Sequence, residues 1–103
     1  MAGPILIVGC GYVGRRLARR LAGAHRVVGV VRSTRSAALL EQLGIDALTL
    51  DLDRPLPANA VPCEPTPAAI FYLAPPAPSG TNDERLQRWL RAVSAPPQVF
   101  VYL

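Results

Sequence analysis

The sequence predicts an α/β fold, a doubly wound parallel sheet with strand order 3-2-1-4-5 that is truncated after its fifth strand. Two observations support this prediction. Short apolar runs alternate with stretches of helical periodicity, and a glycine-rich turn joins the first run to the first helix. The length of 103 residues fits one domain, and 50% apolar residues are enough to build a core. Residues 1–103 are therefore expected to form the N-terminal part of a single domain.

The first strand and helix are the clearest elements. Residues 5–8 form a continuous apolar run, as in strands that are buried on both faces of a parallel sheet. The helix that follows extends to about residue 23. Its apolar positions recur every four residues, at Val13, Leu17 and Leu21, and arginines occupy the opposite face.

The next three elements repeat this alternation. Residues 26–31 are expected to form a β-branched second strand, residues 36–43 a second helix and residues 45–50 a third strand. Gly44 is placed to end the second helix, because glycine adopts the left-handed backbone that closes many helices.

Proline interrupts the pattern after the third strand. Eight prolines fall between residues 54 and 78, so this connection is expected to be an irregular crossover rather than a helix. Within it, residues 68–73 form a proline-free apolar run, which predicts a fourth strand.

The last predicted elements are a helix and a strand. Thr81 and Glu84 have the spacing of a capping box, in which both side chains satisfy backbone groups at the start of a helix. Residues 99–103 then form the predicted fifth strand. The apolar residues expected along one face of the helix are Leu86, Trp89, Leu90 and Val93.

Composition and charge exclude several classes of protein. No apolar run approaches the roughly 20 residues that span a bilayer, and the first residues lack a signal-peptide pattern, so we expect a cytoplasmic protein with no membrane partner. The net charge is +4 and all eleven basic residues are arginines, but without interleaved aromatics they favour a solvated surface over a nucleic-acid site. Cys10 and Cys63 match no metal-ligand spacing, so free thiols and no metal site are expected.

The turn after the first strand carries the motif G-x-G-x-x-G. In this setting the first glycine makes the turn, the second lets a pyrophosphate approach the backbone, and the third lets the helix pack on the strand. The helix N-terminus adds free N–H groups and a partial positive charge. The motif therefore predicts dinucleotide binding in a Rossmann fold. The predicted binding residues of this loop are Gly9, Cys10, Gly11, Tyr12, Val13 and Gly14.

The end of the second strand predicts which dinucleotide binds. NAD-binding units usually carry Asp or Glu there, about 20 residues past the glycines, to accept hydrogen bonds from the adenosine ribose. This sequence has Arg32, whose guanidinium would attract the additional 2′-phosphate of NADP, with Ser33 and Arg35 as further donors. We expect NADP, with NAD as the alternative if Arg32 is simply a solvated residue past the strand.

Three further stretches, together with the glycine loop, resemble a known family. They are residues 30–33, residues 51–52 after the third strand and residues 71–76 at the fourth. The whole chain resembles the N-terminal half of atypical, extended-type short-chain dehydrogenase/reductases, the NAD-dependent epimerase/dehydratase family. Two features depart from that family: the glycine loop is one residue shorter than in most extended members, and Ala-Pro-Pro at 74–76 replaces a more usual Ala-Ala stretch.

The resemblance implies further cofactor contacts and an absent catalytic half. The family's catalytic Ser and Tyr-x-x-x-Lys follow the fifth strand, whereas this sequence has no lysine and ends at Leu103. We therefore expect the chain alone to be catalytically inactive, with a small-molecule substrate only where the missing half is present. The implied contacts are Asp51 and Leu52 with the adenine, and Leu73, Ala74 and Pro75 along the ribose and nicotinamide side.

Three functional hypotheses follow. The first is the NADP-binding part of an oxidoreductase or sugar-nucleotide epimerase/dehydratase. The second is a stand-alone nucleotide-sensing domain like the regulatory domains of potassium transporters, which share the glycine motif and an Asp after the third strand but usually keep an acidic residue where this chain has Arg32. The third is a gene fragment with no function of its own.

Overall fold

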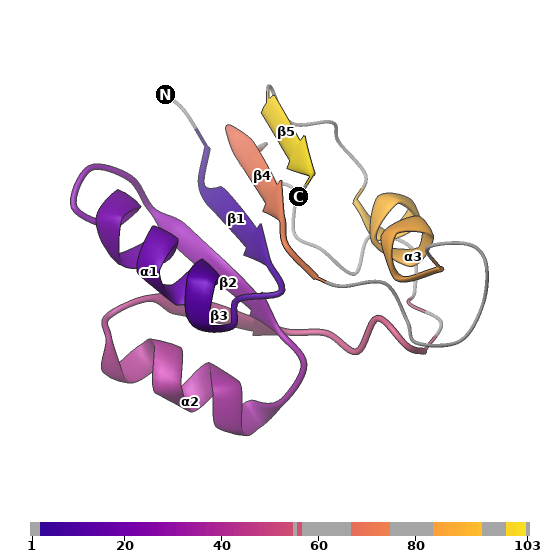
Figure 1. Cartoon of the computed structure of the whole chain (residues 1–103), viewed down its shortest axis with the longest axis horizontal. Helices are drawn as coiled ribbons and strands as arrows, with labels where there is room; N and C mark the ends of the chain where they lie inside the picture. The colour runs from indigo at the N-terminus through magenta and orange to yellow at the C-terminus, as the bar shows by residue number, and fades with distance from the viewer. Residues whose placement is uncertain (1–2, 55, 57–66, 75–83, 94–98, 103) are drawn as a thin grey trace.

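Five parallel strands form one sheet in the order β3-β2-β1-β4-β5, which confirms the predicted fold class and strand order (Figure 1). The computed structural model describes residues 3–54, 56, 67–74, 84–93 and 99–102. The strands are β1 (Ile5–Val8), β2 (Val27–Val31), β3 (Asp46–Thr49), β4 (Ala69–Tyr72) and β5 (Val99–Tyr102). The helices are α1 (Tyr12–Leu21), α2 (Thr34–Gln42) and α3 (Glu84–Ala92).

Helix α2 begins two residues before its predicted start. The cause is Ser33, which is the N-cap: its hydroxyl oxygen accepts a hydrogen bond from the backbone N–H of Ser36 at 3.2 Å. At the other end, Gly44 adopts a φ of +75° directly after the helix, as predicted for the residue that closes it. The predicted capping box at Thr81 and most of the predicted proline-rich crossover lie outside the described residues.

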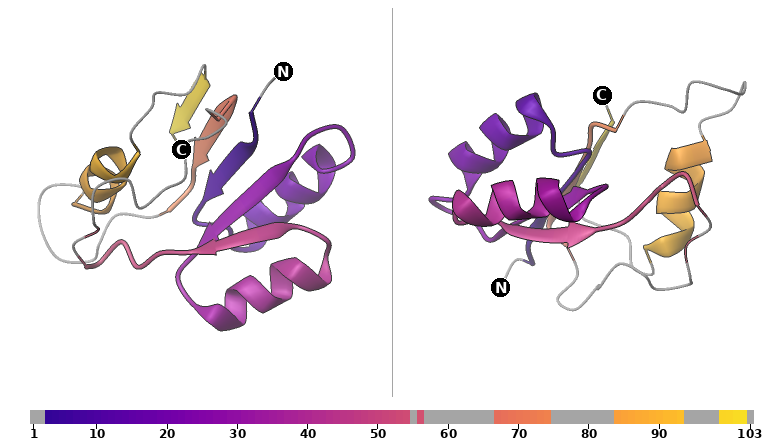
Figure 2. Two further views of the ribbon diagram at one scale, coloured as in Figure 1. Left: turned by 180° about the vertical axis from the view of Figure 1, so that it is seen from behind. Right: turned by 90° about the horizontal axis from the view of Figure 1, so that it is seen from below.

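The sheet separates two layers of helices. Helices α1 and α2 cover one face and α3 covers the other (Figure 2). Strand β1 is buried on both faces because its side chains alternate: Ile5 and Ile7 pack toward α1 and α2, and Leu6 and Val8 toward α3.

Two residues predicted to be buried on helices are instead exposed. Val13 of α1 is 67% exposed, and Leu90 of α3 is 53% exposed. A Cβ at Gly14 would lie 3.3 Å from a methyl of Ile7, so α1 approaches the sheet along the stripe that contains Gly14 and the fully buried Ala18. Val13 precedes that stripe by one residue, which turns it about 100° away. Leu90 is rotated in the same way from the fully buried Trp89.

Candidate dinucleotide site

A cavity of about 330 Å³ opens where β1 to β4 end. It lies at the point where the chain crosses from one side of β1 to the other, and ligands of open α/β sheets bind at such switch points. Three loop residues, six apolar residues and five polar residues line it. They are Gly9, Cys10 and Gly11; Val8, Val30, Val31, Leu50, Leu52 and Ala74; and Arg32, Ser36, Asp51, Asp53 and Arg85.

The glycine loop is shaped by two close approaches and one open space. Gly9 has a φ of +80°, and a Cβ there would lie 2.5 Å from the backbone nitrogen of Ala74, so no side chain fits. A Cβ at Gly14 would lie 3.3 Å from the carbonyl oxygen of Gly9, which is the close contact of helix on turn. At Gly11, in contrast, a Cβ would meet no atom of the described residues within 4 Å. The middle glycine therefore faces room for a ligand to reach the backbone.

The start of α1 suits an anion. Its N-cap is Gly11, which has no side chain to accept hydrogen bonds from the N–H groups of the first turn, and that turn contains no acidic residue. The free N–H groups and the positive end of the helix dipole favour negative charge at this point. The arrangement fits the pyrophosphate of a dinucleotide.

Cys10 belongs to the core as much as to the loop. Its side chain is buried, and its sulfur lies 3.2 Å from the position of a Cβ on Gly29. Burial raises the pKa of the Cys10 thiol, and the positive charge of Arg15 opposes this only in part. The thiol therefore stays protonated at neutral pH and acts as a small apolar group.

The end of β2 presents Arg32 to the cavity. Its side chain is 72% exposed, and Nη2 lies 3.6 Å from Oδ2 of Asp53. Ser33, predicted as a further donor to a phosphate, instead caps α2 and donates its hydroxyl proton to the hydroxyl of Ser36 at 3.1 Å. Arg35 is exposed and is not among the residues that line the cavity.

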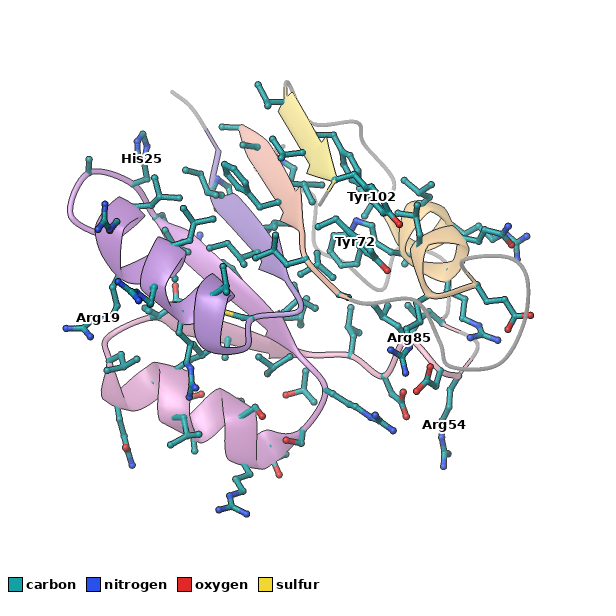
Figure 3. All side chains as sticks on the ribbon, in the orientation of Figure 1. Arg19, His25, Arg54, Tyr72, Arg85 and Tyr102 are labelled. Atoms are coloured by element: carbon teal, nitrogen blue, oxygen red, sulfur yellow. The ribbon has the colours of Figure 1, made fainter. Side chains whose placement is uncertain are left out.

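The turn after β3 holds two carboxylates in fixed positions. Asp51 accepts a hydrogen bond from the backbone N–H of Asp53 at 2.9 Å, which tightens the turn. Asp53 receives two hydrogen bonds from Arg85 of α3, at 2.6 Å from Nε and 2.9 Å from Nη2. Figure 3 shows Arg85 reaching from α3 toward this turn. The hydrogen bonds from Arg85 lower the pKa of Asp53, with smaller contributions from the charges of Arg85 and Arg32.

The predicted residues of the fourth strand fall in different places. Ala74 lines the cavity against Gly9. Leu73 donates its N–H to the carbonyl oxygen of Val8 at 2.8 Å and packs on the face covered by α1 and α2, outside the cavity lining. Pro75 and the side chain of Tyr12 lie outside the described part of the chain.

The structure thus brings together part of the predicted set and adds to it. Sequence reasoning missed three polar lining residues, Ser36, Asp53 and Arg85, and four apolar ones, Val8, Val30, Val31 and Leu50. The sequence could have predicted Asp53, because it is the second acidic residue after the third strand, at the same edge of the sheet as Asp51. Nothing in the sequence indicates Arg85, because it lies 32 residues further along the chain, beyond most of the prolines. The predicted residues that line the cavity are Gly9, Cys10, Gly11, Arg32, Asp51, Leu52 and Ala74.

The fold and the glycine-lined cavity define a dinucleotide-binding domain of the Rossmann type. The sequence model of the TrkA-N domain family matches residues 5–56, from β1 through the turn after β3, and the chain belongs to this family. TrkA-N domains are NAD(P)-binding domains with a Rossmann-like fold. Among the described helices, none has both the length and the apolar content needed to cross a bilayer.

A solved structure supports the fold. The chain named SsCR_L211H superposes with a TM-score of 0.71 at 22% sequence identity. The match covers 99% of this chain and 37% of that one, so this chain spans little more than a third of its length. No curated protein matches the sequence.

The expected membership of the epimerase/dehydratase family is wrong, since the family that matches is TrkA-N. The glycine motif and an Asp after the third strand occur also in the regulatory domains of potassium transporters, so these features do not distinguish the two families. Arg32 stands where the regulatory domains of potassium transporters usually keep an acidic residue, and this difference favours the epimerase/dehydratase family over those domains. The match includes Arg32, so that argument fails.

Proposed function

We propose that this domain binds NADP(H), with the pyrophosphate at the glycine loop and the adenosine end toward β2 and β3. The observation that carries the proposal is Arg32, which lines the cavity at the end of β2 and is largely exposed there. A guanidinium at this position offers paired N–H donors to a 2′-phosphate. An acidic residue, in contrast, would repel the phosphate.

The other lining residues fit the rest of the adenosine half. Leu50 and Leu52 offer an apolar wall for the base, and Asp51 offers a carboxylate to its donors. Ser36 lies in the first turn of α2 beside Arg32 and adds a hydroxyl to the phosphate site. The cavity volume is near the lower end of the roughly 300–1,000 Å³ of small-molecule sites, which suits half of a dinucleotide rather than all of it.

Calorimetric titration of the chain with NADP⁺ and NAD⁺ tests the proposal. Arg32→Asp should lower the ratio of NADP⁺ to NAD⁺ affinity by about tenfold to a hundredfold, because a charge-assisted hydrogen bond is worth about 1.5–3 kcal/mol. Arg35→Asp is the matched control, since Arg35 is exposed outside the cavity lining. An Arg32→Asp variant with an unchanged ratio would show that Arg32 does not bind the phosphate.

Family membership favours nucleotide sensing as the role of that binding. In a sensor, occupancy itself is the signal, whereas in an oxidoreductase the bound cofactor exchanges hydride with a substrate. The chain contains no lysine to lower the pKa of a tyrosine acid, so we expect binding without turnover. NADPH absorbance in the presence of aldehydes, alcohols and nucleotide sugars separates the two roles, because consumption of NADPH would contradict a sensor.

A further inference from the structure

The carboxylate of Asp53 lies between two arginines that hold it very differently. Arg85 binds it through two hydrogen bonds and has a side chain only 15% exposed. The closest approach of Arg32 is from Nη2 to Oδ2 of Asp53, at 3.6 Å, and the Arg32 side chain is 72% exposed. Bidentate pairs are strong and directional, whereas exposed single contacts contribute little. The contact with Arg32 is therefore the one that exchanges.

Hydrogen bonds within its own turn and from helix α3 keep Asp53 in place. Its turn is fixed internally by the hydrogen bond from its N–H to Asp51, and Arg88 of α3 donates to the carbonyl oxygen of Leu52 at 2.8 Å. Arg85 and Arg88 thus tie the turn to α3 at two adjacent residues. Asp53 cannot follow Arg32 if that side chain swings toward a ligand.

We infer that Asp53 competes with the cofactor's 2′-phosphate for Arg32 and so sets the preference between NADP and NAD. This inference rests on the proposed function. When NADP binds, the phosphate takes the guanidinium of Arg32 and Asp53 keeps Arg85, so no carboxylate is left without a cation. When NAD binds, Arg32 keeps its contact with Asp53 and the ribose hydroxyls face the same pair. Asp53 therefore weakens NADP binding relative to NAD binding, and Arg85 limits that penalty.

The Asp53→Asn variant tests this directly. Titration with NADP⁺ and NAD⁺ should show the affinity ratio rising by about three- to tenfold in favour of NADP⁺, the size of one partly exposed charge contact. Asp46→Asn is the matched control, because Asp46 forms an exposed ion pair with Arg26 at 3.3 Å at the opposite end of the sheet. In the Arg32→Gln background the effect of Asp53→Asn on the affinity ratio should fall below about twofold. The guanidinium for which Asp53 and the phosphate compete is then absent.

If Asp53→Asn leaves the ratio of NADP⁺ to NAD⁺ affinity unchanged or lowers it, the inference is overturned. It is also overturned if Asp53→Asn raises this ratio as much in the Arg32→Gln background as in the wild type. A wild-type chain that binds neither dinucleotide overturns the proposed function as well. If Asp53→Asn does not fold, Arg85→Gln serves as the second variant. It leaves Asp53 with Arg32 as its closest remaining cation, so the ratio should fall, and a level or raised ratio would overturn the competition.

Discussion

The two faces of the sheet are held by different means. On the face of α1 and α2, close backbone approach does the packing: a Cβ on Gly29 would lie 2.5 Å from Leu40, which is fully buried against the strand. On the face of α3, large buried aromatic side chains and a set of charged side chains hold the helix against the sheet. Trp89 is fully buried, and Arg85 and Arg88 bind the turn after β3. The first face follows from short local repeats, and the second depends on contacts between distant residues.

Removing the indole should break the α3 face. Trp89→Ala is expected to cost about 3–5 kcal/mol of unfolding free energy, as for large aromatic residues deleted from a core. Hydrogen exchange should show α3 losing protection before α1 and α2 do. Leu90→Ala on the same helix is the control, because Leu90 is half exposed and its loss should cost little.

Trp89→Phe sharpens the same test. Among the described residues, the indole N–H has no hydrogen-bond acceptor, so phenylalanine loses volume and no hydrogen bond. The expected cost is smaller than that of Trp89→Ala, because phenylalanine fills part of the space that alanine leaves empty. If Trp89→Ala and Leu90→Ala unfold at the same urea concentration, the ion pairs and not the indole hold α3.

The turn at Gly9 brings the end of β1 against the end of β4. Gly9→Ala should cost about 2–3 kcal/mol, because alanine is strained at positive φ and its Cβ would overlap the backbone of Ala74. Urea denaturation measures the loss, and dinucleotide titration should show weaker binding. Gly23→Ala, at a position with open space, should change stability by no more than about 0.5 kcal/mol. Equal costs at the two glycines would contradict the tight contact.

The smallest expected effect is on the stability of the fold at acidic pH, through the ion pair between Asp53 and Arg85. Because Arg85 lowers the pKa of folded Asp53, the pair contributes stability above the unfolded pKa of about 3.9, and this contribution is lost as the pH falls through the folded value. Below about pH 5, Asp53→Asn should therefore lose stability less steeply than the wild type does. The fluorescence of Trp89, the one tryptophan in the chain, reports on this face. If wild type and Asp53→Asn lose stability equally steeply as the pH falls, the ion pair between Asp53 and Arg85 does not contribute to folding stability.

Local patterns were enough to predict the sheet. The apolar run of β1 and the glycine turn gave the first unit, and the alternation of strands and helices gave the strand order. The hydrophobic periodicity predicted Val13 and Leu90 to be buried because both are apolar. In the structure, the face of each helix that contacts the sheet is set by residue size instead: by the small Gly14 in α1 and by the large Trp89 in α3.

The site was predictable only where it is local. The glycine loop, Arg32 and Asp51 follow strands directly, so their places at the carboxyl edge came from the order of elements. The role of Arg85 depends on where α3 packs, which no spacing in the sequence records. Ser33 was assigned to a ligand because cap and phosphate donors use the same hydroxyl, and the helix takes it.

The contact between Gly9 and the backbone of Ala74 joins two positions that are 65 residues apart in the chain. A side chain at position 9 would collide with the backbone nitrogen and Cα of residue 74, and every amino acid carries these atoms, so glycine is required at 9 whichever residue stands at 74. A library randomised at both positions should therefore return glycine at 9 in every folded clone, with more than one residue at 74. The course of the chain at the end of β4 thus fixes the amino acid of the glycine loop, and a designer who alters the specificity of this domain should leave Gly9 unchanged.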